Sequence, residues 1–289
     1  MLLGALSLVA LVAPSLSCAK NDTSTTFNDE PVDPGGDAGT EAGPGFAEAG
    51  AEPSTLDVEC SQDTKQIYVI ATDKSLYRFY PDVTKFVRIG TIGCPTTAGT
   101  FSMAIDRRGT AWVEFTDGRL YAVNTQNATC KPTAFVAGQT GFTNFGMGYA
   151  KNGDSMNGET LYVAGDALAS LDTKSFELKF LGSLTFGRTE LTGLDTSLYA
   201  FSVGSGVVAG LNKATGATEV TYRTSATDAT AAFAFAQWGG DFWLFTGQNT
   251  STVTRYSPIT DVSTVAVADT GMLIVGAGSS TCAPTKSPR

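Results

Sequence analysis

Residues 102–124 read SMAIDRRGTAWVEFTDGRLYAVN and contain three short apolar segments separated by turns. The first segment covers 102–106, the second covers 111–113, and the third is centred on Val123. Between the second and third lies Thr116-Asp117-Gly118-Arg119, and an Asp-Gly pair suits the type I′ turn of a β-hairpin. The stretch therefore predicts consecutive antiparallel strands.

The same arrangement recurs five times from residue 56 onward. The second strand of each unit carries a large aromatic side chain, namely Tyr68, Trp112, Tyr162, Tyr199 and Trp243. These positions are 44, 50, 37 and 44 residues apart, which is the period of β-propeller blades. First strands are expected at 56–60, 102–106, 145–149, 190–194 and 233–237, and third strands around Phe79, Val123, Leu171, Leu211 and Tyr256. Because the aromatics recur at one place in every unit, we interpret them as packing between blades rather than as a row that stacks on sugars.

A single four-stranded meander exposes an apolar face, and radial packing of such sheets around an axis buries it. We therefore predict an all-β fold, a β-propeller of five four-stranded blades over residues 56–282. Residues 272–275 supply a surplus first strand, which we expect to close the ring against 56–60. A six-bladed ring with one degenerate blade is the alternative.

Four cysteines, Cys60, Cys94, Cys130 and Cys282, form an even set inside the propeller region and allow three connectivities. We favour Cys60 with Cys282, which would fasten the ring at its closure, and Cys94 with Cys130, which would cross-link neighbouring blades. Disulfides predict an oxidising compartment. A zinc site needs closer Cys or Cys/His spacing, and the chain has no histidine, so we expect no metal.

The chain begins with an apolar run from Leu2 to Ala13, too short to span a bilayer and suited to the h-region of a signal peptide. Ser15-Leu16-Ser17-Cys18 then resembles the lipobox at which bacterial lipoproteins are cleaved and acylated. The resemblance implies a signal peptide over 1–17, a lipid on Cys18 and a membrane anchor in the cell envelope. The alternative is a plain secretory signal and a soluble secreted or periplasmic protein.

Residues 18–55 are rich in Gly, Ala, Pro, Asp and Glu, a composition that cannot bury enough apolar surface to fold. Positions 21–55 hold eight acidic residues and no Lys or Arg, so they account for −8 of the net charge of −9. We predict a disordered acidic linker over 18–55 and a flexible tail over 283–289. The propeller itself is nearly neutral, and neither part offers the basic surface that nucleic-acid binding requires.

Two segments, 102–113 and 210–216, resemble repeats of NHL-like and quinoprotein-like propellers, and the whole region 56–282 resembles the propeller domain of uncharacterised bacterial envelope lipoproteins. Such a resemblance implies a fold far more than a function. We expect a tethered, monomeric binding or scaffold module for a protein or glycan partner, with no cofactor. The alternative is a hydrolase, a lyase or a quinoprotein-like oxidoreductase that uses the central funnel.

Carboxylates are the remaining candidates for chemistry, because a chain without histidine cannot build Ser-His-Asp, Cys-His or His-metal sites. A glycosidase-like site would need two acids projecting into the funnel. The acids on the expected first strands are Asp57, Glu59, Asp106 and Glu190, and we take Asp57, Asp106 and Glu190 as the funnel candidates. Solvated or turn-capping acids are commoner than catalytic ones, so we do not expect an enzyme.

Three more acids, Asp73, Asp117 and Asp166, occupy similar turns between second and third strands. These turns share one face of a propeller, where a cation could lie between them. Asp is also favoured in hairpin turns because its side chain bonds the local backbone. We prefer that second interpretation.

Overall fold

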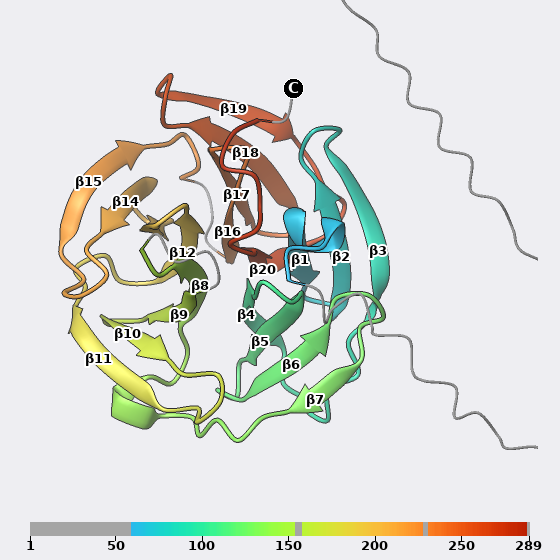
Figure 1. The fold of residues 1–289 in the computed structure, drawn as a ribbon. Helices are drawn as coiled ribbons and strands as arrows, with labels where there is room; N and C mark the ends of the chain where they lie inside the picture. Colours follow the sequence, from blue (N-terminus) through green and yellow to red (C-terminus); the bar gives the residue numbers. More distant parts are fainter. Residues whose placement is uncertain (1–58, 154–157, 228–230, 288–289) are drawn as a thin grey trace, which may run out of the picture. The chain divides into compact units, whose positions relative to one another are not determined.

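The computed structural model describes residues 59–153, 158–227 and 231–287, all within one compact unit, Ala51–Arg289. These residues form five antiparallel four-stranded sheets arranged as blades around an axis, a β-propeller (Figure 1). Two short 3-10 turns accompany them, η2 (Gln62–Lys65) and η3 (Gln139–Gly141). No helix in the described ranges is long and apolar enough to cross a membrane.

The strands run outward from the axis in chain order within each blade, except at the ring closure. Blade 1 contains β20 (Ile274–Ser279), β1 (Ile67–Ala71), β2 (Ser75–Tyr80) and β3 (Lys85–Thr91). Blade 2 contains β4 (Thr100–Ile105), β5 (Thr110–Phe115), β6 (Leu120–Asn124) and β7 (Cys130–Pro132), and blade 3 contains β8 (Gly146–Lys151), β9 (Glu159–Ala164), β10 (Ala167–Leu171) and β11 (Leu178–Ser183). Blade 4 contains β12 (Thr189–Leu194), β13 (Ser197–Ser202), β14 (Val207–Leu211) and β15 (Thr218–Arg223), and blade 5 contains β16 (Ala232–Trp238), β17 (Asp241–Gly247), β18 (Ser251–Ser257) and β19 (Val262–Val267). The five-bladed prediction is confirmed, and the six-bladed alternative is wrong.

The ring is closed by β20, which pairs antiparallel with β1 from Ile67 opposite Ser279. Closure by the C-terminal strand is therefore confirmed, but the expected first strand at 56–60 is wrong, because Glu59 and Cys60 lie in a turn. The innermost strand of blade 1 is β20, which is alone at that position among the described strands. Gly276 and Gly278 of β20 allow it to pack closely on β4. A Cβ on either glycine would lie 3.0 Å from a backbone nitrogen of β4.

Five apolar cores fill the spaces between neighbouring blades, and each draws residues from two blades. The repeated aromatics lie one in each core: Tyr68 between blades 1 and 2, Trp112 between 2 and 3, Tyr162 between 3 and 4, Tyr199 between 4 and 5, and Trp243 between 5 and 1. Four of them are buried, and Tyr199 is half-buried against the ring of Phe242 at 4.7 Å between centroids. The period of the sequence therefore reflects the contact that each blade makes with the next.

Both favoured disulfides form. Cys60–Cys282 joins residues 222 apart in sequence and Cys94–Cys130 joins residues 36 apart. Cys94 follows the outermost strand of blade 1 and Cys130 opens the outermost strand of blade 2, so this bond links neighbouring blades as expected. Two disulfides point to an oxidising compartment, extracellular or periplasmic.

Candidate functional site

The five innermost strands, β20, β4, β8, β12 and β16, run in the same direction, so the central channel has two different ends. We call the end where these strands begin the open face; it also carries the turns between second and third strands. We call the other end the closure face, because the chain after β20 and the Cys60–Cys282 disulfide lie there. The two ends have different chemistry.

At the open face lies a cavity of about 600 Å³. Its walls include residues at the start of all five inner strands, together with the loop at 140–144, the turn at 164–167 and Arg188. The named wall residues of the inner strands are Thr100, Phe101, Phe145, Gly146, Thr189, Glu190, Ala232, Phe233 and Val275. A cavity of this volume is in the range that holds small organic ligands. We call it the open-face cavity.

Glu190 is a wall residue of the open-face cavity and is only 3% exposed. Its Oε2 accepts a hydrogen bond of 2.9 Å from the hydroxyl of Ser102, across the axis on β4. Burial raises the pKa of this carboxyl well above its ordinary value, although the nearby Arg188 cation acts in the opposite direction. Burial therefore favours the uncharged form of this carboxyl.

Glu114 lies on β5 behind the cavity wall and is fully buried. Its Oε2 accepts a 3.0 Å hydrogen bond from the backbone N–H of Phe145, which joins blade 2 to the start of β8. Burial raises its pKa to about 9, and the neighbouring Glu190 adds to the rise. This second carboxyl is also neutral near pH 7, and it positions the wall rather than lining it.

Beyond the cavity the channel is crossed by hydrogen bonds between inner strands. The backbone N–H of Gln237 on β16 lies 3.1 Å from the hydroxyl of Thr192 on β12 and 3.3 Å from that of Ser279 on β20. Gln237, Thr192 and Ser279 are all buried. Small polar side chains therefore fill the axis below the cavity.

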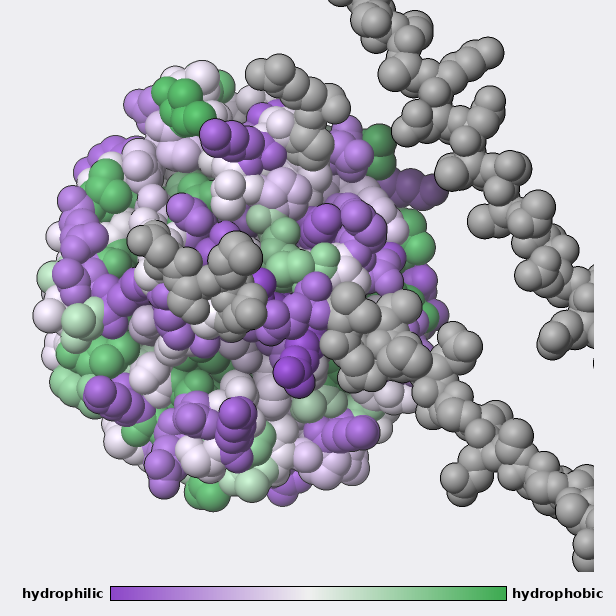
Figure 2. Space-filling view, in the orientation of Figure 1, coloured by the Kyte–Doolittle hydropathy of each residue, from purple (hydrophilic) through white to green (hydrophobic). Residues whose placement is uncertain are grey.

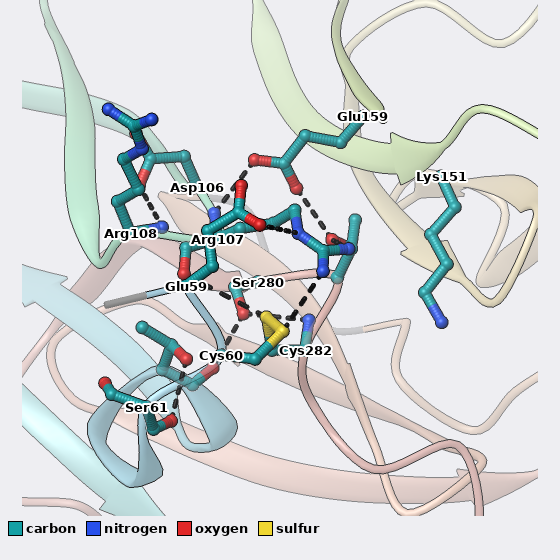
Figure 3. Close-up of a disulfide and its surroundings, with 12 residues drawn as sticks. Glu59, Cys60, Ser61, Asp106, Arg107, Arg108, Lys151, Glu159, Ser280 and Cys282 are labelled. Carbon is teal, nitrogen blue, oxygen red and sulfur yellow. Dashed lines mark hydrogen bonds and ion pairs between the residues drawn. A yellow bond between two sulfur atoms is a disulfide. The ribbon is translucent and has the colours of Figure 1, made fainter. Parts of the chain in front are cut away.

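The closure face is organised around Arg107, which is 7% exposed and lies just after β4 (Figure 3). Its Nη2 donates to Cys60 Sγ at 3.3 Å, and its backbone N–H donates to Glu159 Oε1 at 2.8 Å. The hydroxyl of Thr281 donates to Glu159 Oε2 at 2.7 Å (Figure 3). Burial raises the pKa of Glu159 to about 7. These contacts tie blade 3 to both sides of the ring closure.

The funnel candidates do not come together. Asp106 follows the end of β4, at the closure face, where it accepts hydrogen bonds from the backbone N–H groups of Arg108 and Thr110 and from the indole of Trp112. Glu190 bonds Ser102, four residues earlier along β4, so the two acids are separated by roughly 13 Å along the axis at the usual rise of a strand. Asp57 and Cys18 lie outside the described residues.

The three turn acids occupy equivalent turns at the open face, but two of them bond locally. The carboxylate of Asp73 accepts a hydrogen bond from the backbone N–H of Ser75 at 2.9 Å, and that of Asp117 accepts one from the backbone N–H of Arg119 at 3.2 Å. Asp166 is exposed at the rim of the open-face cavity. In the part of the chain that the structure describes, no group of three His, Cys, Asp or Glu residues is arranged to hold a metal ion.

Sequence reasoning missed Arg188, Glu114, Glu159 and Arg107. Glu114 had a local signal, because it interrupts the apolar run Ala111-Trp112-Val113-Glu114-Phe115 of a strand that is buried on both faces. Arg188 had none, since it stands in a linking segment whose position depends on the ring. A second cavity, of about 650 Å³, lies beside the turn between β13 and β14 and also has Arg188 in its wall. In Figure 2 hydrophobic patches are scattered over a mainly polar face, and the exposed large apolar side chains lie mostly on or beside the outermost strands.

Comparison with known proteins gives only distant similarity. No family model matches the chain, and no curated protein matches it. Among solved structures, a chain of a nidogen/laminin complex is 13% identical, with 74% of this chain and 85% of that chain covered and a TM-score of 0.47. A protein of unknown function from Bacteroides thetaiotaomicron is 12% identical, covering 73% and 62%, with a TM-score of 0.44. A catalytically inactive virginiamycin B lyase from Staphylococcus aureus, with quinupristin, is 15% identical, covering 68% and 68%, with a TM-score of 0.40. At these values the similarities carry no argument, and the assignment as a propeller rests on the five sheets of the chain itself.

Proposed function

We propose that this chain is an exported, envelope-tethered propeller that binds a partner, a protein or a glycan, at its open-face cavity. The observation that carries the proposal is that the cavity gathers residues from the starts of all five inner strands at one end of the axis. The walls combine phenylalanines with hydroxyl, amide and charged side chains, and this mixture is typical of ligand sites.

The proposal is tested by filling the cavity. Thr143 is exposed at the rim, so Thr143→Trp should reduce the cavity volume without disturbing a core. Thr218→Trp is the matched control, because Thr218 is equally exposed on the outermost strand β15. Both variants and the unmodified protein are applied to an immobilised panel of glycans and peptides. Binding that is lost only in Thr143→Trp supports the proposal; equal binding by both variants, or no binding by the unmodified protein, contradicts it.

A hydrolase, a lyase or a quinoprotein-like oxidoreductase in the funnel has less support. Two-carboxylate hydrolysis needs one ionised and one protonated acid on either side of a substrate. Asp106 and Glu190 lie at opposite ends of the channel, and Glu114 is buried behind the wall with a raised pKa like that of Glu190. Hydrolysis of any glycan or peptide retained by the panel, abolished by Glu190→Gln, would favour the enzyme instead.

The tether is the second part of the proposal and rests on residues 1–55. The apolar run before Cys18 and the Ser15-Leu16-Ser17-Cys18 sequence support export and lipidation, and the two disulfides agree with an exported protein. Metabolic labelling with palmitate in a bacterial host tests it. Label is expected in the unmodified protein and not in Cys18→Ser; no label in either would favour a soluble secreted or periplasmic protein.

A further inference from the structure

Arg188 is an exposed cation at the wall of the open-face cavity. Its guanidinium carbon lies 5.3 Å from the centre of the Phe233 ring, which holds the side chain against the wall. Among the described residues, no carboxylate lies within ion-pair distance of it. The cavity therefore presents a positive charge that is positioned by an aromatic ring and available to an anionic group.

Glu190 lies two residues further on and is a wall residue of the same cavity. Arg188 reaches the cavity wall from the bend before β12, and Glu190 reaches it from the second residue of that strand. A buried carboxylate next to Arg188 would offset its charge, but burial raises the pKa of Glu190 and so favours its uncharged form. Arg188 thus lies beside a carboxyl whose neutral form can donate a hydrogen bond, a combination suited to a carboxylate, while the exposed Asp166 lies at the rim on the turn between β9 and β10.

The rest of the cavity suits the body of a sugar. Phe101, which is half-buried, supplies an apolar wall on which the C–H face of a sugar ring can pack. Thr116, Thr140 and Thr143 line the cavity, are exposed and make no side-chain hydrogen bond to another described residue. Hydroxyl groups at the edge of a ring and an apolar face are what a saccharide presents, and the cavity matches both features.

We infer that the open-face cavity binds a saccharide that carries a carboxylate, with the carboxylate paired to Arg188 beside Glu190 and the sugar ring against Phe101. The inference rests on the proposed binding function and narrows it to one class of ligand. A charge-assisted hydrogen bond to a guanidinium contributes enough to give at least a roughly tenfold preference for the acidic sugar over its neutral counterpart.

The test uses two pairs of sugars that differ at the carboxylate: glucuronate with glucose, and galacturonate with galactose. Titration calorimetry measures each with the unmodified protein, Arg188→Gln and Arg108→Gln. Arg108 is an exposed arginine on the closure face, so its variant changes the net charge equally without touching the cavity. We expect the acidic sugars to bind at least about tenfold more tightly, and this preference to be lost in Arg188→Gln and kept in Arg108→Gln.

Three results would overturn the inference: equal binding of the neutral sugars, a preference that survives Arg188→Gln, or no binding of any of the four sugars. Thermal unfolding of Arg188→Gln checks that the variant is folded. Failure here is distinguishable from failure of the proposed function, because the panel experiment with Thr143→Trp reports on occupancy of the cavity by any ligand. If Thr143→Trp abolishes binding to the panel but the protein shows no preference for the uronates, the proposed binding function stands and the inference of an acidic sugar is wrong.

Discussion

Removal of the Cys60–Cys282 disulfide should destabilise the protein more than removal of Cys94–Cys130. The bonds close loops of very different length, 222 and 36 residues of sequence separation. The chain-entropy relation gives about 5.4 kcal/mol for the long loop and about 3.8 kcal/mol for the short one, a difference of about 1.6 kcal/mol. The ring-closing bond also accepts a hydrogen bond from the buried Arg107, and the loss of this contact adds to the difference.

The experiment compares the double variants Cys60→Ala/Cys282→Ala and Cys94→Ala/Cys130→Ala. Urea unfolding of the propeller without added reductant gives the free energy of unfolding of each. A smaller m-value in the first variant would indicate that its native state has already opened between β20 and the rest of the ring. Equal losses of unfolding free energy in the two variants, or a larger loss in Cys94→Ala/Cys130→Ala, would refute the argument that the ring-closing disulfide contributes more to stability.

Three other predictions concern buried acids and the ring centre. In the folded protein the pKa of Glu159 is raised to about 7, so the protonated carboxyl stabilises the fold fully below about pH 4.5. This stabilisation, at most about 3 kcal/mol, is lost as the pH rises to about 7. Glu159→Gln should flatten this part of the curve of unfolding free energy against pH, measured by urea unfolding at several pH values. The pKa of Glu114 is about 9, so its ionisation should lower the free energy of unfolding further above pH 7, by up to about 1.4 kcal/mol per pH unit. Glu114→Gln should keep the hydrogen bond to Phe145 and be more stable than the unmodified protein at pH 9. An equal dependence of stability on pH in the variant would contradict the assignment of the raised pKa to Glu114. Gly146→Ala should prevent folding or lower the free energy of unfolding by roughly 3 kcal/mol or more, because a Cβ would overlap the Thr189 carbonyl on the neighbouring β12. Gly204→Ala is the control: Gly204 has open space around it, so this variant should keep the melting temperature within a few degrees.

Much of the fold could be predicted because the information is local and repeated. Each second strand carries its aromatic at the same place, and each of these aromatics lies in the core between its own blade and the next. The error at 56–60 arose at the single blade that is not built from consecutive strands. Periodicity cannot say which of two candidate segments forms the innermost strand of blade 1, because that depends on how closely β20 can approach β4, a strand far from it in the sequence.

The candidate site could be predicted much less well. The sequence singled out Glu190, which the structure places in the wall of the open-face cavity, but it grouped this acid with Asp106, which lies at the other end of the same channel. The difference follows from strand direction: Glu190 is near the start of β12, and Asp106 comes after the end of β4. Arg188, a cation in the cavity wall, stands between strands, and its neighbours are fixed only by the closed ring.

The narrow ring explains why the open face is the place where a ligand can bind. Inner strands approach so closely that β8 and β12 meet through Gly146, Gly148 and Gly193, and the axis below is filled by hydrogen-bonded polar groups, so no ligand-sized space remains inside. At the closure face, the segment after β20 and the contacts of Arg107 with Glu59 and Cys60 occupy the other end. The same closure that completes blade 1 therefore fills one end of the axis and leaves the starts of the inner strands accessible only at the open face.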